Sequence, residues 1–323
     1  MNNIQDICDK YRIEFNDNEK EYSDIILEMY NNDNINKYNF QDPIILNLIG
    51  LYYYVKIKDY DEMKKYYLMS IDKCYTNAMY NLGLYYYSEE KEYNLMKKYY
   101  LMAIDNNCSK SMNNLALYYY LEEKNYEEMK KYLLMAIDRG YYLSTYIFGH
   151  YYQSEEKNYE LMKKYYIMCI DNNCFLSMNN LGVYYHNIND YEEMKKYYLM
   201  AIDKGCVESM FNLGYYYESS LEKDYELMKK YYLMAIDKGF SKSMFNLALY
   251  YGNSKDYELM KKYYLMAIDK GCINAIYNLA LYYEEVEKDY ELMKKYYLMA
   301  IKQNDSIIST KAINKLKYYF YTK

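Results

Sequence analysis

The only two histidines are the first side chains whose type could support metal binding or acid–base chemistry. His150 and His186 fall on the same helix face in two adjacent repeats of the sequence. A neutral imidazole can ligate a metal ion and can exchange a proton near neutral pH. A metal site needs at least three protein ligands, and no third ligand recurs in register with this pair. The two histidines therefore predict side chains that line a binding face, and no metal or cofactor is expected.

The other residue types that carry chemistry do not form a recognisable site either. The sequence contains no Gly-rich phosphate loop, no Ser-His-Asp arrangement and no HExxH string. Its seven cysteines include no CxxC pair. Four of them occupy the same place in their repeats, which is typical of a small apolar residue at a helix start and of free thiols in a reducing compartment. These are Cys108, Cys174, Cys206 and Cys272. The sequence therefore predicts a protein that is not an enzyme.

Charge and composition narrow the class of partner. The net charge is -6 and the pI is about 5.3, which argues against a dedicated surface for nucleic acid or anionic membranes. Arginine, the usual side chain for bidentate phosphate or guanine contacts, occurs only at Arg12 and Arg139. The 56 tyrosines, the single proline and the lack of tryptophan indicate AT-rich codons rather than selection for tyrosine chemistry.

A repeated four-residue string sets the architecture. Successive copies of MKKY are 32 to 34 residues apart, and a period of this length is typical of a stacked helical hairpin. We therefore predict an all-α, right-handed α-solenoid of about eight helix–turn–helix repeats of about 33 residues. The copies begin at Met63, Met96, Met129, Met162, Met194, Met228, Met260 and Met293.

The first helix of each repeat, helix A, has an apolar stripe that includes very small residues. In the copy over 77–107, Met79, Leu82, Gly83 and Tyr86 follow the i, i+3, i+4, i+7 spacing of an amphipathic helix. Gly or Ala recurs at the place of Gly83, and Ser or Ala recurs at the place of Ala78. We expect both sets of small residues to mark the close contact between helix A and helix B.

The second helix, helix B, contains the MKKY string and begins after an Asp, Asn or Glu that can cap it. A glutamate three residues after the cap predicts a capping box in three copies, at Glu62, Glu128 and Glu193. The lysine pair and the acidic residues share one face, which we expect to be a solvated convex surface with i,i+4 pairs such as Glu226–Lys230. Gly or Asn closes most copies of helix B, with Cys74 as an exception.

The ends of the chain differ from the repeats. Residues 1–41 are predicted to be an N-terminal capping segment, 42–304 the repeat array and 305–323 a C-terminal capping helix, since an array needs polar ends. Asp42 and Pro43 suit the start of the first helix A. No secretory signal is recognised, and the longest apolar run, 44–55, is too short to span a bilayer. We expect a soluble, intracellular and cytoplasmic protein.

Two stretches of the last repeat carry a family resemblance. Gly271, Ala275, Leu279-Ala280 and Tyr283, followed by Asp289-Tyr290, Met293, Tyr297 and Ala300, resemble the Sel1-like repeat of the tetratricopeptide superfamily. The pattern covers roughly residues 44–321 and recurs eight times. The resemblance implies a scaffold or adaptor that binds protein partners in a concave groove lined by the A helices, and it implies no catalytic residue. The AT-rich composition is typical of giant DNA viruses of amoebae and of some protists, so a viral source and a host-cytoplasmic location are one expectation.

Within this resemblance, the helix A positions that vary from repeat to repeat are the candidate partner-binding residues. They include the residue after the repeated Tyr, which reads Tyr87, Tyr120, Gln153, His186, Glu218, Gly252 and Glu284. An aromatic groove of rigid anchors is one interpretation, and drift at solvent-facing sites is the other. The groove set is Tyr80, Asn113, Tyr146, His150, Asn179, His186, Phe211, Tyr215, Phe245 and Tyr277.

A helical-repeat RNA-binding protein of the pentatricopeptide kind is the alternative function, because its period is similar. Such a protein reads bases with polar side chains in a positive groove, whereas this groove is predicted to be aromatic, aliphatic and acidic. A recruiting segment in residues 1–41 is a third possibility for which no motif is found. The sequence names neither the partner nor the oligomeric state.

Overall fold

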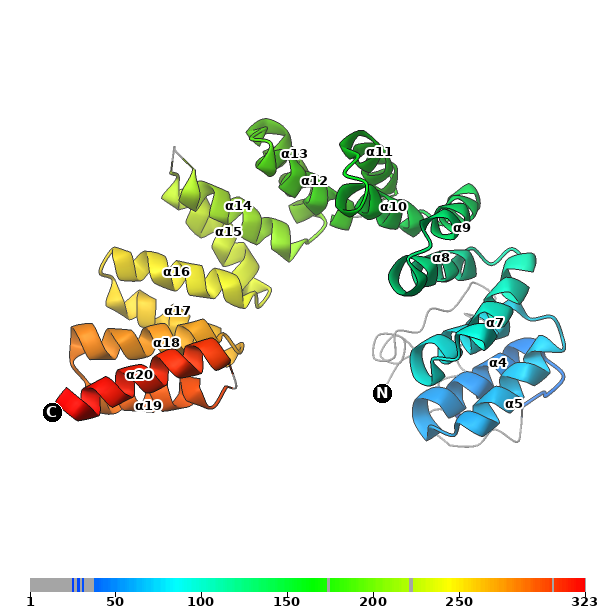
Figure 1. The fold of residues 1–323 in the computed structure, drawn as a ribbon, viewed down its shortest axis with the longest axis horizontal. Coiled ribbons are helices and arrows are strands. Elements are labelled where there is room, and N and C mark those ends of the chain that lie inside the picture. Colours follow the sequence, from blue (N-terminus) through cyan, green and yellow to red (C-terminus); the bar gives the residue numbers. More distant parts are fainter. Residues whose placement is uncertain are drawn as a thin grey trace. The chain divides into compact units, whose positions relative to one another are not determined.

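Helices form all regular elements of the described chain in the computed structural model (Figure 1). The structure describes residues 38–172, 175–220, 223–303 and 305–322, together with residues 25, 28, 29 and 31. The α-helices are α4 (Pro43–Tyr52), α5 (Tyr60–Ile71), α6 (Thr76–Tyr85), α7 (Tyr93–Asp105), α8 (Ser109–Tyr118), α9 (Tyr126–Asp138), α10 (Leu143–Ser154), α11 (Tyr159–Ile170), α12 (Phe175–Asn187), α13 (Tyr191–Asp203), α14 (Val207–Ser219), α15 (Tyr225–Asp237), α16 (Ser241–Asn253), α17 (Tyr257–Asp269), α18 (Ile273–Tyr282), α19 (Tyr290–Ile301) and α20 (Ser306–Thr322).

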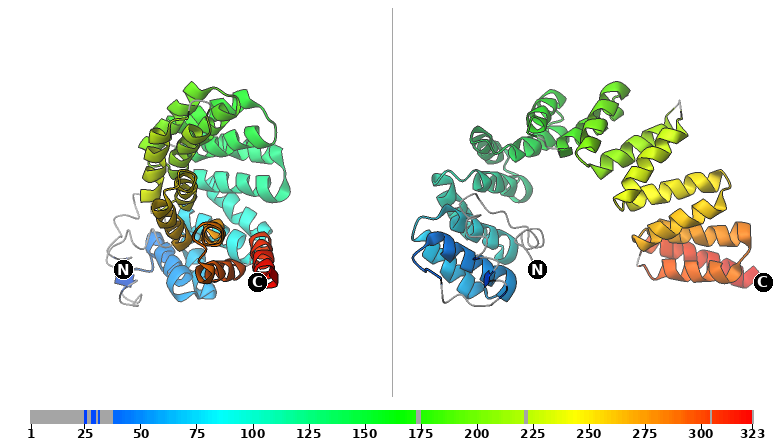
Figure 2. Two further views of the ribbon diagram at one scale, coloured as in Figure 1. Left: turned by 90° about the vertical axis from the view of Figure 1, so that its left-hand side faces the viewer. Right: turned by 180° about the vertical axis from the view of Figure 1, so that it is seen from behind.

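The helices alternate as the A and B helices of eight repeats, so that α4 and α5 form repeat 1 and α18 and α19 form repeat 8. The chain divides into two compact units, Met1–Tyr165 and Tyr166–Lys323, with α11 crossing the division. Both views of Figure 2 show successive helix pairs within each unit. The predicted all-α fold of about eight helix–turn–helix repeats is confirmed.

Single π-helical turns end four of the A helices. They are η1 (Tyr53–Ile57), η2 (Tyr86–Glu90), η3 (Tyr119–Glu123) and η4 (Tyr283–Glu287). A π turn accommodates one extra residue in a helix. Repeats 5 and 7 have one residue fewer between the repeated Tyr and the helix B cap, and their A helices, α12 and α16, continue without a π turn. The variation in repeat length therefore falls in the turn between helix A and helix B.

The predicted helix ends are confirmed except at Glu92, whose side chain makes no capping hydrogen bond at the start of α7, and the capping box is not formed. The Asp59 side chain accepts from the Glu62 backbone N–H, while Gly140 and Asn107 adopt the left-handed conformation that closes helix B. In a capping box the Glu62 carboxylate accepts from the Asp59 N–H. Here that N–H donates to the Tyr53 carbonyl, and Glu62 forms an ion pair with Lys65 at 3.0 Å. The same replacement occurs at Glu128 and Glu193.

A buried tyrosine of helix B lies directly against the glycine or alanine of its own helix A. A Cβ atom placed on Gly83 would come within 2.6 Å of the Tyr100 ring, and one on Gly214 within 2.7 Å of the Tyr232 ring. Only glycine or alanine occupies this position in the eight repeats, so the small residue sets how closely the two helices approach. The prediction that the Gly83 position marks the contact between helices A and B is confirmed.

The prediction for the second set of small residues is wrong, because these residues face the preceding repeat. The Ser209 hydroxyl donates to Oδ1 of Asn179, on helix A of the preceding repeat, at 2.8 Å. The Ser144 hydroxyl makes the same bond to Asn113 at 2.8 Å. Each serine is fully buried, so this bond offsets the desolvation of its hydroxyl.

A hydrogen bond from an asparagine to the buried tyrosine also joins successive repeats. The Asn246 amide donates to the Tyr232 hydroxyl at 3.1 Å, and the Asn278 amide donates to the Tyr264 hydroxyl at 3.4 Å. Repeat 3 carries Leu133 in place of the tyrosine, and repeat 4 carries Ile147 in place of the asparagine. Both of these replacements are buried, so the polar pair has been exchanged as a unit for an apolar one.

The two ends of the array have their own contacts. Asp42 caps α4, as predicted, with Pro43 in its first turn. Most of residues 1–41 lies outside the described residues, although Met29 packs against Ile45 and Ile49 of α4. In α20 an exposed isoleucine, Ile313, stands where the repeats have the buried Gly or Ala. The domain boundaries at 41 and 304 stay predictions. No helix among the described residues has the length and apolar character to cross a bilayer.

The buried serine hydroxyls predict opposite effects on the free energy of unfolding for two serine-to-alanine substitutions. Ser243 is the one described buried side chain whose hydroxyl has no hydrogen-bond partner, and the preceding repeat has Phe211 at the position where repeats 3 and 5 offer an asparagine. We expect S243A to raise the free energy of unfolding by about 1 kcal/mol, since alanine removes an unpaired buried hydroxyl.

The matched variant S209A is expected to lower the free energy of unfolding by about 1 kcal/mol, since it breaks a bond that is formed. Urea unfolding of both variants at pH 7 checks the pair. If both substitutions change the free energy of unfolding in the same direction, the assignment of the buried hydroxyl bonds is wrong.

Candidate partner-binding face

Four residues of the predicted groove set are rings that contact the buried tyrosine ring of their own repeat, stacked at Phe211 and Tyr80 and tilted at Phe245 and Tyr277. Ring centroids are 5.8 Å apart for Phe211 and Tyr232 and 6.0 Å apart for Phe245 and Tyr264. Tyr277 and Tyr80 make the equivalent contacts with Tyr297 at 5.7 Å and with Tyr100 at 6.1 Å. All four rings are half-buried. One face of each ring is therefore fixed by the core, and the remaining surface is held with little rotational freedom.

Asn113 was predicted to face a partner, and the structure corrects this. Its side chain is only 2% exposed, and its amide oxygen accepts from the Ser144 hydroxyl. Asn179 makes the equivalent bond, and it also accepts from the Asn212 amide at 3.2 Å. An asparagine at this position thus accepts from the serine of the next repeat, whereas an aromatic residue packs against the tyrosine of its own repeat, and Tyr80 in addition accepts from the next repeat through its hydroxyl. Sequence comparison of the repeats detects the variation but not which of these two roles it serves.

The two histidines belong to different units and have different surroundings. His150 is exposed on α10 in the first unit. His186 is half-buried on α12 in the second unit, with ring centroids 6.2 Å from Tyr191 and 6.4 Å from Tyr216. Within the described residues, no group of three or more His, Cys, Asp or Glu side chains could hold a metal ion.

The remaining groove residues, Tyr146 and Tyr215, differ in how much surface they offer. Tyr146 is half-buried on α10 of the first unit. Tyr215 on α14 is 48% exposed and stacks on Phe211, with ring centroids 6.3 Å apart. Phe211 and Tyr215 thus form a continuous aromatic surface on one helix, supported from below by Tyr232.

A cluster of three rings lies where helix A meets the start of helix B and the next helix A. In the first unit, Tyr54 is 6.1 Å from both Tyr60 and Tyr85, and Tyr60 is 5.5 Å from Tyr85, between ring centroids. The same cluster recurs with Tyr87, Tyr93 and Tyr118 and with Tyr120, Tyr126 and Tyr151. In the second unit His186 takes the place of the first ring.

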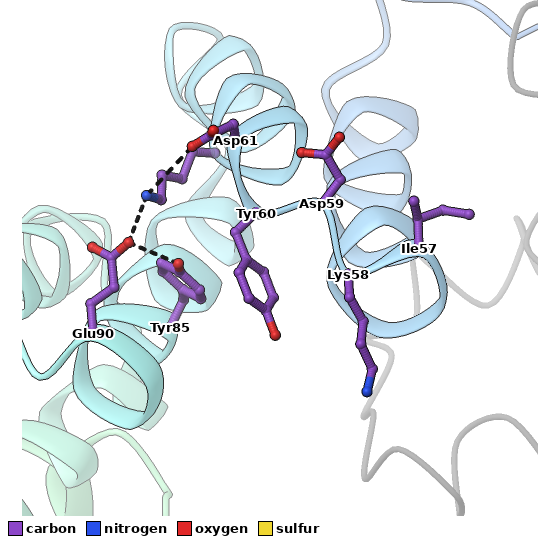
Figure 3. A pocket seen from close by; sticks show the side chains of 8 residues that line it. Ile57, Lys58, Asp59, Tyr60, Asp61, Tyr85 and Glu90 are labelled. Carbon is purple, nitrogen blue, oxygen red and sulfur yellow. Dashed lines mark hydrogen bonds and ion pairs between the residues drawn. The ribbon is translucent and has the colours of Figure 1, made fainter.

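In repeats 2 to 4, the turn between helix A and helix B carries two adjacent glutamates that contact the preceding repeat. We call this pair the glutamate clasp. Its first member, Glu89, accepts from the Tyr54 hydroxyl of the preceding helix A at 2.9 Å. Its second member, Glu90, forms an ion pair with Lys64 of the preceding helix B at 2.6 Å and accepts from Tyr85 at 2.8 Å (Figure 3). The clasp recurs at Glu122-Glu123 and at Glu155-Glu156.

The clasp corrects the expectation that both lysines of MKKY face solvent. The first lysine, such as Lys64, is only 26% exposed and lies over the Tyr85 ring as well as against Glu90. The second, such as Lys65, is 56% exposed and pairs with Glu62 three residues earlier. The predicted i,i+4 pair is also wrong, since Glu226 pairs with Lys229 rather than with Lys230. The sequence signal for the clasp is a Glu-Glu-Lys string that ends three of the turns.

The clasp varies together with its partner in repeats 7 and 8. Glu287 of repeat 8 keeps the ion pair with Lys261, at 3.0 Å. The first clasp position of repeat 8 is Val286, and the matching tyrosine position of repeat 7 is Gly252. A carboxylate is therefore present only where there is a hydroxyl for it to accept from.

The ion pairs perturb the titration of the clasp. The hydrogen bond from Lys64 lowers the pKa of Glu90, and the bond from Lys130 does the same for the pKa of Glu156. Burial, together with the hydrogen bond to Glu156, raises the pKa of Tyr151 to about 12, so this phenol is a proton donor at neutral pH. A glutamate whose pKa is lower in the folded state stabilises the fold above pH 4.5, and this contribution is lost as the pH falls through the lowered pKa.

We expect the triple variant E90Q/E123Q/E156Q to be less stable than the native chain at pH 7 and to depend less on pH between 7 and 3. Each surface pair contributes at most about 1 kcal/mol, so the combined effect is expected to be on the order of 2 kcal/mol. Urea midpoints across this pH range measure it. The double variant E62Q/E128Q, which breaks only exposed pairs within one helix, is the control. Equal pH dependence of the triple variant and the native chain would contradict the account.

Comparison with known proteins agrees with the repeat architecture. A family model described as Tetratricopeptide repeat matches residues 176–203 and 241–269. A comparison with curated protein sequences found no match. The structure of a protective antigen with an SLR fold, from uropathogenic Escherichia coli strains, aligns with a TM-score of 0.61 and 19% identity over 85% of this chain and 67% of that one. A Sel1 repeat protein from Oxalobacter formigenes aligns with a TM-score of 0.53 and 21% identity over 73% of this chain and 100% of that one. The chain thus has the helical-repeat fold of these two structures, and two of its segments match the tetratricopeptide repeat model.

Proposed function

We propose that the protein is an interaction scaffold that binds a protein partner on the exposed face of its A helices. Repeats of this fold generally serve as protein-interaction scaffolds, and that general role supports the proposal. The observation that carries it is the row of rings in the second unit, where Phe211, Phe245 and Tyr277 each pack against a buried tyrosine ring. Rings that are fixed before binding lose little entropy when a partner covers them.

The chemistry of this face favours a partner segment with apolar side chains. Tyr215 is 48% exposed, and the same position in the next two repeats is Leu249 and Leu281, both half-buried. Each of these residues follows a ring of the row by four positions, so the two lie on the same side of their helix. A contiguous apolar face that a folded chain leaves in contact with water is typical of a binding surface.

The RNA-binding alternative has no observation in its favour. The tyrosine, phenylalanine and leucine side chains of this face carry no positive charge that could contact a phosphate. The acidic side chains Glu208 and Glu218 lie on α14, the helix that also carries Tyr215. Electrostatic attraction to phosphates is the main source of nonspecific affinity for RNA. A gel shift with single-stranded RNA at low salt, in which we expect no complex, tests this alternative.

Partner capture from the source cell, with one face altered at a time, tests the scaffold proposal. We expect Y215A/L249A to reduce recovery of the specific partner at least tenfold, because it removes exposed anchors without disturbing the buried tyrosines. The control variant L233A/L265A removes two leucines of helix B that are 39% and 44% exposed, and recovery is expected to be unchanged. Equal recovery with all three proteins, each shown to be folded by circular dichroism, would exclude this face.

A further inference from the structure

One cavity in the second unit lies where a carboxylate replaces a ring. The pocket, of about 360 Å³, lies between repeats 6 and 7 and is lined by Glu218, Lys223, Tyr225, Tyr250, Asn253 and Ser254. In repeats 1 to 3 the position of Glu218 is held by Tyr54, Tyr87 and Tyr120, and these rings complete the three-ring clusters. With Glu218 in that position, only Tyr225 and Tyr250 remain, with centroids 5.2 Å apart and planes at 43°.

Glu218 is held in place by one of its two oxygens. The buried Tyr232 hydroxyl donates to Oε2 of Glu218 at 2.6 Å, and it accepts from the Asn246 amide at 3.1 Å. Within the described part of the chain, no side chain or backbone group pairs with Oε1 of Glu218. The carboxylate is therefore fixed by the core and still has an acceptor available beside two tyrosine rings. A fixed anion attracts an organic cation by charge, and the Tyr225 ring adds a cation–π contact, since the Lys229 ammonium already lies over the Tyr250 ring at 6.0 Å from its centroid.

The last repeat shows what this position binds when a cation is in reach. Glu284 occupies the position of Glu218 in repeat 8, and the Tyr297 hydroxyl donates to its Oε2 at 2.6 Å. The Lys315 ammonium of α20 lies 3.1 Å from the same carboxylate. Lys315 also lies 3.4 Å from Glu285, and the ammonium over the nearby Tyr319 ring is that of Lys294, at 5.6 Å from the ring centroid. The chain thus contains an example of the same carboxylate and hydroxyl pair with a lysine ammonium bound to the carboxylate.

We propose that the pocket formed by Glu218, Tyr225 and Tyr250, which we call the Glu218 pocket, binds the alkylammonium group of a lysine side chain. The lysine belongs to the protein partner of the proposed function. The identity of the molecule that carries the lysine therefore rests on that function, whereas the binding of an alkylammonium group does not. Lys223 also lines the Glu218 pocket, but it forms no ion pair with Glu218. Lys223 instead lowers the local affinity for any cation, and its neutral replacement strengthens binding.

Binding of an alkylammonium group in the absence of a partner can be tested with n-butylammonium chloride and the full-length chain. The backbone amide resonances of Asn253 and Ser254 report on the Glu218 pocket in a titration at constant ionic strength, with n-butanol as the neutral isostere. We expect a Kd on the order of 1–10 mM for butylammonium, as for a single small ligand group, and no saturable shift with butanol. E218Q retains a carbonyl oxygen for the Tyr232 hydroxyl, so it is expected to fold and to weaken binding at least fivefold.

Two further variants separate the Glu218 pocket from general surface charge. E208Q removes the same charge from α14, outside the Glu218 pocket, and is expected to leave the Kd unchanged, whereas K223M is expected to lower the Kd at least twofold. The proposal is overturned if E218Q binds butylammonium as tightly as the native chain, or if E208Q weakens binding equally. Loss of partner capture in Y215A/L249A alongside unchanged capture in E218Q would overturn the lysine contact and leave the scaffold function standing.

Discussion

The contact between a buried tyrosine of helix B and a glycine or alanine of helix A determines the rest of the structure. The tyrosine ring occupies the space that a larger side chain on helix A would need, as at Gly83 and Gly214. Its hydroxyl then meets the asparagine of the next repeat, as Tyr232 meets Asn246. One side chain thus sets both the spacing inside a repeat and the link to the following one. It also supports the ring above it, so the partner-binding face depends on the same contact.

Most departures from the repeat pattern occur as matched changes across an interface. Leu133 and Ile147 replace a tyrosine and an asparagine together, and Gly252 and Val286 replace a tyrosine and a glutamate together. A polar group without its partner would be costly in either place, so each pair changes as a unit. Ser243 has no matched partner, because the preceding repeat has Phe211 where repeats 3 and 5 have the asparagine that accepts from the next serine.

The sequence was sufficient for the fold because the period, the small residues and the caps all depend on local geometry. It was not sufficient for contacts between repeats. Within helix B alone, the first lysine of MKKY has the position of a surface residue. Only the contact with the next repeat shows that Lys64 pairs with Glu90 and lies over the Tyr85 ring. Asn113 and Phe211 occupy equivalent, variable positions, yet one is a buried acceptor and the other a supported ring. Variation alone could not separate these roles, because the distinction depends on which side chain the next repeat presents. Comparison of the repeats shows that Glu218 stands at a variable position. The cavity beside Glu218 is found only in the structure, where side chains of two successive repeats line it.

The central claim is that the tyrosine hydroxyl joins the partner-binding face to the next repeat. Hydrogen exchange of the native chain and of Y232F tests it most directly, because phenylalanine keeps the buried ring and removes only the hydroxyl that Glu218 and Asn246 share. The account predicts faster amide exchange in the last turn of α14 and in α16, with exchange in α6 and α8 of the other unit unchanged. Exchange rates in α14 and α16 equal to those of the native chain would contradict it.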